Sequence, residues 1–250
     1  MKDGVLTLRQ AAESVQVDAA ELRHAAQRGE LEAVERAGEW LFGAASLQDW
    51  TQRRLIASDS RRLAAHHLAL DGRRRRACGG GETGIAPLFN VDAIDLSLSA
   101  KTKAGALRDM TDLAAASGMV YDPDALFRGL EEREEAASTA IGEGAAFLHM
   151  KELQPYIFED FFIAYGRSLR PVYFGAPDGA PTRHFFLICS TGRERHLHTL
   201  ARLAMLAHGT GLLERLDAAE DAAGAIKAVR DCENEWSADA GLHGGGRAGE

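Results

Sequence analysis

One stretch of the chain, residues 133–151, gathers the residue types that a phosphoryl-transfer site needs. Arg133 has a planar, permanently charged guanidinium, and Ser138 and Thr139 have hydroxyl groups that donate hydrogen bonds. The stretch ends near His149, and neutral imidazole is a good nucleophile near pH 7. Because phosphoryl transfer needs mainly positioning and charge stabilisation, these residues predict a histidine that receives a phosphoryl group.

The elements expected around these residues would bring them together. Ala145 to Leu148 is an apolar run between turn signals, which is typical of a buried strand. His149 should then lie where the chain leaves the sheet. Gly142 and Gly144 form a Gly-x-Gly turn, whose backbone N–H groups we expect to converge on an anion. The spacing alone also fits a purely structural histidine.

The same stretch resembles the phosphorylation site of phosphotransferase-system enzyme IIA domains of the fructose/mannitol/nitrogen-regulatory type. The resemblance extends over about residues 88 to 232. Leu148 stands where that family usually has proline, so the fixed φ of proline is lost before the histidine. An Arg-Glu pair, a Ser-Thr pair, the Gly-x-Gly turn and the final histidine carry the match: Arg133, Glu134, Ser138, Thr139, Gly142, Gly144 and His149.

The resemblance implies a partner and a role for each of these residues. His149 would accept a phosphoryl group from the phosphohistidine carrier protein of that system, with no metal or organic cofactor. Arg133, Ser138 or Thr139 would stabilise the phosphoryl oxygens. Two alternatives stay open: a sugar-transport phosphocarrier that passes the phosphoryl group to a IIB component, and a IIA-like sensor that is never phosphorylated.

A second candidate histidine follows the last predicted strand. Thr191 and Glu194 have capping-box spacing, which predicts a helix over 192–208. On that helix His196 falls on the apolar stripe, whereas His198 should lie further out. His196 also matches the family's second active-site histidine, and the resemblance implies that it steadies the phosphoryl group. No Cys pair or His-Glu-x-x-His motif accompanies the two histidines, so a zinc site is disfavoured.

The rest of this C-terminal domain, residues 87–232, alternates helical and strand patterns. We therefore predict an α/β fold, and the resemblance implies the enzyme IIA-like mixed sheet flanked by helices. A tail over 233–250 is predicted to be disordered. The expected strands are 89–98, 145–148, 161–165 and 184–188, and the expected helices are 101–117, 123–135, 192–208, 211–216 and 221–232.

Residues 4–70 predict a small winged helix-turn-helix domain. Thr7 and Gln10 form a capping box for a helix over 8–15, and Asp18 caps a second helix over 19–28 that stops at Gly29. A hairpin over 31–42 follows, and Ser46 is expected to cap a third helix. This order resembles the excisionase/MerR-like family. The match rests on Leu6, Thr7, Ala11, Ala12, Val17, Arg28, Gly29, Glu30, Leu31, Gly38, Trp40, Phe42, Leu47 and Trp50.

In that family the second helix enters the DNA major groove and the wing touches the backbone. Residues 1–50 carry five basic and nine acidic side chains, a net charge of −4, whereas DNA-binding surfaces are usually basic. A protein-interaction or oligomerisation module therefore remains the alternative, and the resemblance also allows a homodimer. The predicted DNA-contacting residues are Arg23, His24, Gln27, Arg28 and Arg36.

Between the two domains, residues 71–86 combine four arginines with a glycine run, which predicts a flexible linker. The N-terminus lacks the apolar core of a signal peptide, and no apolar run is long enough to insert in a membrane. Three widely spaced cysteines suggest neither disulfides nor a metal site. We therefore expect a cytoplasmic protein.

The fusion of the two domains motivates a further hypothesis: the phosphorylation state of His149 controls DNA binding or transcription.

Overall fold

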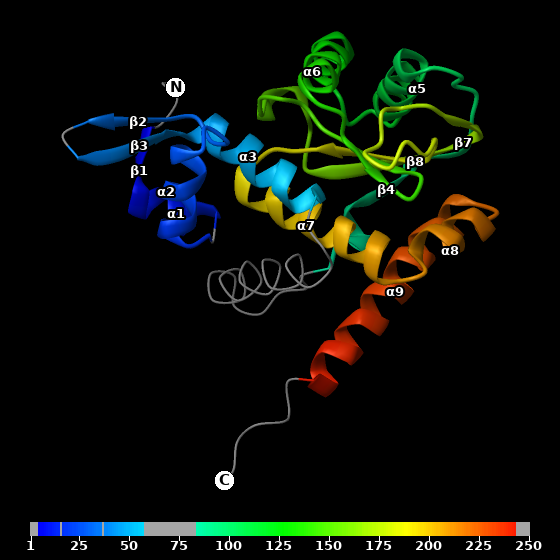
Figure 1. Ribbon diagram of the computed structural model, residues 1–250. Coiled ribbons are helices and arrows are strands. Elements are labelled where there is room, and N and C mark those ends of the chain that lie inside the picture. Colours follow the sequence, from blue (N-terminus) through cyan, green and yellow to red (C-terminus); the bar gives the residue numbers. More distant parts are fainter. Residues whose placement is uncertain (1–4, 16, 37, 58–83, 244–250) are drawn as a thin grey trace. The chain divides into compact units, whose positions relative to one another are not determined.

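The structure, a computed structural model, describes residues 5–15, 17–36, 38–57 and 84–243 (Figure 1). These residues form two compact units. The first comprises the described part of 1–81 together with 193–201, and the second comprises the described part of 82–192 together with 202–250. Most of the predicted linker, and the last seven residues of the predicted tail, lie outside the described ranges. Within those ranges every helix is too short or too polar to cross a membrane.

Within the described part of 1–81, the chain forms a three-stranded antiparallel sheet, in the order β1-β3-β2, and three helices. Leu22 of the second helix and Phe42 of the central strand are fully buried, and Leu47 of the third helix is almost so, which gives this unit a small core. The element bounds are β1 Val5–Thr7, α1 Leu8–Val15, α2 Ala19–Gln27, β2 Ala33–Arg36, β3 Glu39–Gly43 and α3 Ala44–Ala57.

Local capping explains where α1 and α2 begin. The Thr7 backbone N–H donates to Gln10 Oε1 at 3.0 Å, and the Gln10 N–H donates to Thr7 Oγ1 at 3.4 Å, which confirms the predicted box. Asp18 accepts a hydrogen bond from the Ala20 N–H. The predicted cap at Ser46 is wrong: α3 already begins at Ala44, and the Ser46 hydroxyl donates to Glu32.

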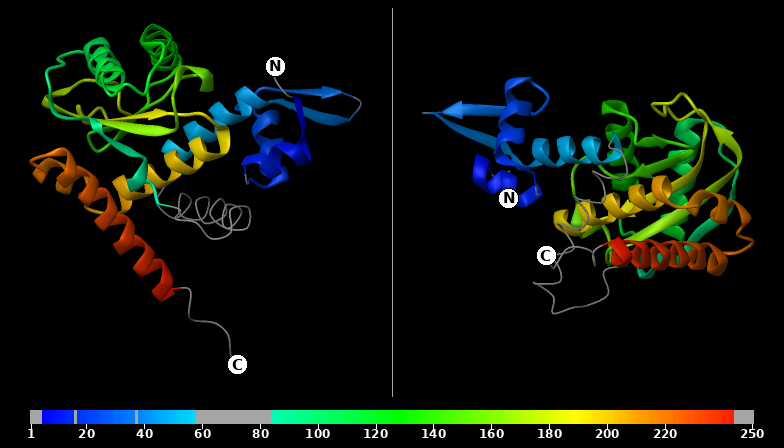
Figure 2. Two further views of the ribbon diagram at one scale, coloured as in Figure 1. Left: turned by 180° about the vertical axis from the view of Figure 1, so that it is seen from behind. Right: turned by 60° about the horizontal axis from the view of Figure 1, so that its bottom comes forward.

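The second unit is a mixed sheet, in the order β4-β7-β8-β6-β5, covered by helices on both faces. Helices α5 and α6 lie on one side of the sheet and α8 and α9 on the other (Figure 2). The strands are β4 Phe89–Leu98, β5 Ala140–Gly142, β6 Ala145–Leu148, β7 Phe162–Val172 and β8 Thr182–Cys189. The α-helices are α5 Lys103–Ala116, α6 Pro123–Ala136, α8 Leu212–Ala218 and α9 Ala222–His243, together with the part of α7 (Arg193–Gly209) from residue 202 onward. Short 3-10 turns cover Ala86–Leu88 and Pro155–Ile157.

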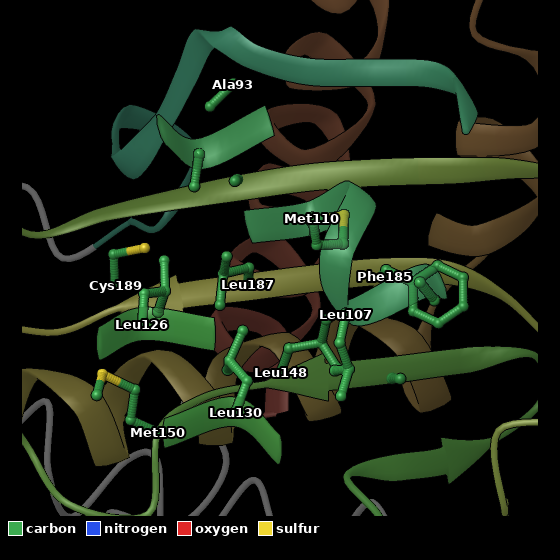
Figure 3. Close-up of a cluster of buried hydrophobic side chains, with 14 of the residues drawn as sticks. Ala93, Leu107, Met110, Leu126, Leu130, Leu148, Met150, Phe185, Leu187 and Cys189 are labelled. Carbon is green, nitrogen blue, oxygen red and sulfur yellow. The ribbon is translucent and has the colours of Figure 1, made fainter. Parts of the chain in front are cut away.

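The core that supports the site lies between the sheet and helices α5 and α6 (Figure 3). Leu148, the last residue of β6, is fully buried in it with Met110 of α5 and Leu126 of α6. A leucine in place of the family's proline is therefore accommodated by apolar packing. The side chain of Leu98 packs directly against the backbone of Gly166 in β7. A Cβ at Gly166 would lie 2.3 Å from Leu98 Cδ1, so this position has no room for a larger residue.

Several predicted boundaries and one predicted cap in this unit differ from the structure. Helix α5 begins at Lys103 and not at residue 101, because Thr102 caps it through the Gly105 N–H. Helix α7 begins at Arg193 with Gly192 as its N-cap, so Thr191 does not occupy the N-cap position that the predicted capping box gave it. The predicted disordered tail is helical as far as His243.

The extension of α9 has a structural reason. Glu233, at the start of the predicted tail, is buried and accepts hydrogen bonds from the N–H groups of Ile85 and Ala86 and from Arg202 Nε. Trp236 lies close to Gly209, where an added Cβ would be 2.7 Å from its ring. These long-range contacts hold the helix, and none of them is visible in the local sequence pattern.

Candidate functional site

His149 lies directly after β6, at the end of the strand, as predicted. Its side chain is 1% exposed. Its Nδ1 lies 2.8 Å from the carbonyl oxygen of Phe147. Since a carbonyl oxygen only accepts hydrogen bonds, Nδ1 carries the ring proton and the lone pair of the neutral ring is on Nε2.

Arg133 is the side chain that meets this lone pair. It lies in the last turn of α6, is 1% exposed, and donates from Nε to His149 Nε2 over 3.1 Å. Its Nη1 also donates to the carbonyl oxygen of Ala137 at 2.8 Å. The structure therefore brings together two of the five predicted site residues, with a permanent positive charge beside the unprotonated ring nitrogen.

Glu134, the next residue of α6, holds the segment that leads into β5. Its Oε1 accepts hydrogen bonds from the Thr139 N–H, at 2.8 Å, and from the Thr139 hydroxyl. Its Oε2 lies 2.7 Å from Lys103 Nζ at the start of α5. The Glu134 side chain is 3% exposed, whereas that of Lys103 is 35% exposed, so a partly exposed lysine neutralises a buried carboxylate.

The Ser138 hydroxyl donates to the carbonyl oxygen of Phe174 at 3.2 Å and accepts from the Ala140 N–H. Both predicted hydroxyls thus donate to groups of the protein itself, Ser138 to Phe174 and Thr139 to Glu134. Their direct contact with a phosphoryl group stays a prediction.

The Gly-x-Gly turn does not have the predicted role. Gly142 and Gly144 adopt φ of 91° and 84°, but they precede β6, whereas His149 follows it. The four residues of that strand separate the turn from the histidine by roughly 13 Å. The Glu143 N–H, between the glycines, donates to Asp178 Oδ2 at 2.9 Å, and this bond lowers the pKa of Asp178. The turn binds the protein's own carboxylate.

His196 is fully buried in α7, as its position on the apolar stripe predicts. His198 is also buried, at 3% exposed, so the expectation that it lies further out was wrong. Both belong to the 193–201 part of α7, which groups with the first unit. The role of His196 in steadying the phosphoryl group stays a prediction.

Sequence patterns missed Lys103 as part of the site. It lies 30 residues before Arg133 in a different helix, and no local motif distinguishes it from other helix-start lysines. Glu134 was part of the family match but had no assigned role. A buried carboxylate that needs a cation is the signal that identifies both residues, and only the tertiary structure reveals it.

Within the described ranges, no group of three or more His, Cys, Asp or Glu side chains is placed to hold a metal ion.

A separate buried pair lies elsewhere in the sheet: Tyr165 and His184 join their side chains through a 2.8 Å hydrogen bond to His184 Nδ1. Asp217 Oδ1 lies 3.7 Å from the other ring nitrogen of His184. Burial is the main cause that lowers the pKa of His184 to about 4.

The five predicted DNA-contacting residues are all exposed on the first unit. Arg23 and Gln27 line a groove of about 880 Å³ that also includes Trp40 of β3. Arg28 instead makes two hydrogen bonds to the carboxylate of Glu30, at 2.6 and 2.9 Å, and this interaction raises its pKa. His24 and Arg36 complete the set.

Comparison with known proteins identifies the family to which the second unit is similar. A family model described as "Phosphoenolpyruvate-dependent sugar phosphotransferase system, EIIA 2" matches residues 87–231. The fructose-specific EIIA component of Haloferax volcanii is 32% identical over 140 residues, which are 55% of this chain and 89% of that protein. A nitrogen regulatory protein of Bradyrhizobium diazoefficiens is 32% identical over 141 residues, again 55% and 89% of the two chains.

Solved structures show the same fold. The nitrogen regulatory protein IIA-Ntr of Neisseria meningitidis superposes with a TM-score of 0.52 at 23% identity, over 58% of this chain and 98% of that one. The mixed sheet with its flanking helices is thus the enzyme IIA fold predicted from the sequence. The match of the family model to more than half of the chain shows that the protein belongs to the type 2 EIIA family of the phosphoenolpyruvate-dependent sugar phosphotransferase system.

Proposed function

We propose that His149 accepts a phosphoryl group on Nε2 from the phosphohistidine of the carrier protein of this system. The observation that carries the proposal is the Nδ1–H to Phe147 carbonyl bond, which leaves the Nε2 lone pair facing Arg133. The unprotonated nitrogen of a neutral imidazole is the nucleophile that the reaction requires. No metal ion or organic cofactor takes part in the proposed step.

In the transfer, the Nε2–P bond forms as the N–P bond of the donor histidine breaks. The donor ring, protonated on its other nitrogen, leaves neutral with the electron pair of the broken bond. His149 retains its Nδ1 proton and becomes a positively charged phosphoimidazole, which the Phe147 carbonyl stabilises. Arg133 then exchanges its hydrogen bond to Nε2 for bonds to phosphoryl oxygens, where its charge lowers the barrier. His196 would add a further hydrogen bond.

Access to the ring is part of this proposal. His149 is 1% exposed, so a donor histidine reaches Nε2 only after the residues around the ring have moved. Buried groups of this kind become accessible through local opening or through binding of a partner. We therefore expect the carrier protein to promote exposure of His149 as it docks.

Two destinations of the phosphoryl group follow from the relatives. One is named as a fructose-specific component and another as a nitrogen regulatory protein, so a sugar-specific component and a regulatory protein both occur among the proteins similar to this chain. We favour regulation, because an additional N-terminal unit precedes the family domain. Two alternatives to regulation remain. In one, the chain passes the phosphoryl group to a IIB component; in the other, it is a IIA-like sensor that is never phosphorylated.

The direct test is intact-mass measurement after incubation with phosphoenolpyruvate, enzyme I and the carrier protein. We expect the wild-type chain to gain one acid-labile phosphoryl group and His149→Gln to gain none. His208→Gln is a matched control, because His208 is a histidine of the same unit that lies beside Glu143. An unmodified wild-type chain, with donors proven active on another IIA domain, would contradict the proposal and support the unphosphorylated sensor.

For the first unit we propose a winged helix-turn-helix role in DNA binding, with dimerisation as a further expectation. The observations that favour it are two short helices followed by an antiparallel hairpin, with Arg23, His24 and Gln27 exposed on α2. The pairing of Arg28 with Glu30 favours the alternative, a module that binds protein. In either case, phosphorylation adds nearly two negative charges at His149, and we propose that these charges alter the binding of DNA or protein by the first unit.

A further inference from the structure

We propose that Lys103 and Glu134 are positioning residues that fix the orientation and the ring tautomer of His149. The inference rests on the proposed function, because it concerns the same acceptor nitrogen. Its observational basis is a continuous series of contacts, one ion pair followed by hydrogen bonds, that begins at a partly exposed lysine of α5 and ends at His149 Nδ1. Neither residue contacts the imidazole in this series, so they act through the backbone between them.

The first link joins two helices. Lys103 Nζ lies 2.7 Å from Glu134 Oε2 and also 3.3 Å from the Glu134 carbonyl oxygen. The ammonium group lies 5.1 Å from the centre of the Phe174 ring, which adds a cation–π contact. A lysine bound on three sides has little freedom, so it fixes the carboxylate as well as neutralising it.

The second link passes from the carboxylate to the backbone of the sheet. Glu134 Oε1 accepts from both the N–H and the hydroxyl of Thr139. The Thr139 carbonyl oxygen then accepts the N–H of Phe147 at 3.0 Å. The Phe147 carbonyl oxygen, in turn, is the group that accepts the Nδ1–H of His149. The position of Thr139 thus sets the position of the carbonyl that determines the tautomer.

The same segment also holds the other ring nitrogen. Arg133, beside Glu134 in α6, donates to His149 Nε2 and to the carbonyl oxygen of Ala137. The segment 133–139 therefore acts on both nitrogens of the acceptor ring. Arg133 donates to Nε2 directly, and Thr139 positions the Phe147 carbonyl that binds Nδ1. If the Glu134 carboxylate loses its cation, the buried charge is no longer compensated and this segment is expected to rearrange.

The test uses the full-length protein labelled with nitrogen-15 in histidine. Long-range proton–nitrogen NMR spectra report which ring nitrogen of His149 is protonated, and they need no phosphorylation. We expect a single Nδ1–H tautomer in the wild type, a mixture of tautomers in Lys103→Met, and recovery in Lys103→Arg. Lys101→Met, which removes an exposed lysine two residues earlier, serves as the control. Unchanged His149 signals in Lys103→Met would overturn the inference.

A double-mutant cycle tests the route through Glu134 by the initial rate of phosphoryl transfer. We expect Lys103→Met to lower the rate about tenfold, which is less than the hundredfold that a misplacement of about 1 Å can cause. In the Glu134→Gln background, where no carboxylate needs a cation, the same substitution should change the rate less than about twofold. Equal losses in both backgrounds would contradict the proposed route.

The two measurements separate the possible failures. If the wild type is not phosphorylated but the His149 tautomer responds to Lys103→Met, the proposed function fails and the positioning role stands. If transfer proceeds and neither the tautomer nor the rate responds, the positioning role fails alone. Should Lys103→Met not fold, the comparison of Lys103→Arg, Glu134→Gln and the uncharged double variant gives the same decision, because only the double variant lacks both charges.

Discussion

His149 has two ring nitrogens in different surroundings, and that difference gives the residue its proposed role. Nδ1 faces a carbonyl oxygen that can only accept, whereas Nε2 faces a guanidinium that can only donate. The sequence predicted that Arg133 and His149 belong to one site. It did not predict the tautomer, because the carbonyl of Phe147 takes its position from strand pairing and not from its side chain.

The misread Gly-x-Gly turn shows the limit of residue types alone. Two glycines near an expected phosphate suggest an anion-binding nest, and this turn does bind a carboxylate. The carboxylate belongs to Asp178, 35 residues later in the chain. Sequence spacing gives no account of such a distant partner, whereas strand length alone already places the turn at the other end of β6.

His184 provides a prediction about acid stability. Burial lowers its folded-state pKa to about 4, below the usual value of 6.5, so between these limits the unfolded chain binds more protons than the folded chain. The stabilisation is complete above pH 6.5 and is lost as the pH falls towards 4. We expect the wild type to lose about 2 kcal/mol more unfolding free energy than His184→Asn between pH 7 and pH 5.

Urea unfolding at the two pH values measures this difference. The asparagine side-chain oxygen still accepts the Tyr165 hydroxyl, but it does not titrate. Equal acid sensitivity of the two proteins would show that His184 does not contribute.

At the scale of elements, α9 continues beyond the C-terminal end of the segment that the family model covers. There it contacts the residues that precede the N-terminal end of the same segment. That model matches residues 87–231, whereas Glu233 binds Ile85 and Ala86, which lie just outside the match on the other side. Arg202 of α7 compensates the carboxylate at 2.7 Å. The contact therefore anchors the point at which the chain enters the domain.

We predict that Glu233→Gln lowers the free energy of unfolding by about 3 kcal/mol, because it removes the negative charge from a buried ion pair with Arg202. Glu235→Gln is the matched control two residues later, since its ion pair with Arg215 is exposed and should contribute little. Chemical denaturation of both variants gives the comparison. Equal stability of the two variants would mean that the buried contact does not hold the helix.

Element types and many boundaries could be predicted because their causes are local. Pro123 after Asp122, and Thr7 with Gln10, specify helix starts within four residues. Two of the errors have non-local causes: α9 continues because Glu233 meets a segment 148 residues away, and β1 forms because Val5–Thr7 pairs with β3. Pattern reasoning has no access to such partners.

At the scale of the whole molecule, the chain joins an EIIA domain in the second unit to the first unit, and the proposed regulation depends on the first unit binding DNA. Titration of sonicated duplex DNA at several salt concentrations tests this. If phosphate contacts dominate, affinity falls steeply with salt. Arg23→Ala should weaken binding more than Arg28→Ala, because Glu30 already occupies Arg28.

The same titration with phosphorylated and unphosphorylated protein tests the coupling between the units. Different affinities are the expected result. Equal affinities would reject coupling through DNA, and no binding at low salt would assign the first unit to protein interaction or oligomerisation.

The central claim is that His149 Nε2 is the phosphoryl acceptor, and the most direct test is NMR of the phosphorylated protein labelled with nitrogen-15 in histidine. Phosphorus–nitrogen coupling identifies the ring atom that carries the phosphoryl group. We predict one phosphoryl group, on Nε2 of His149, with the Nδ1 proton retained. A phosphoryl group on Nδ1, on another residue, or on no residue after incubation with an active donor would contradict the account.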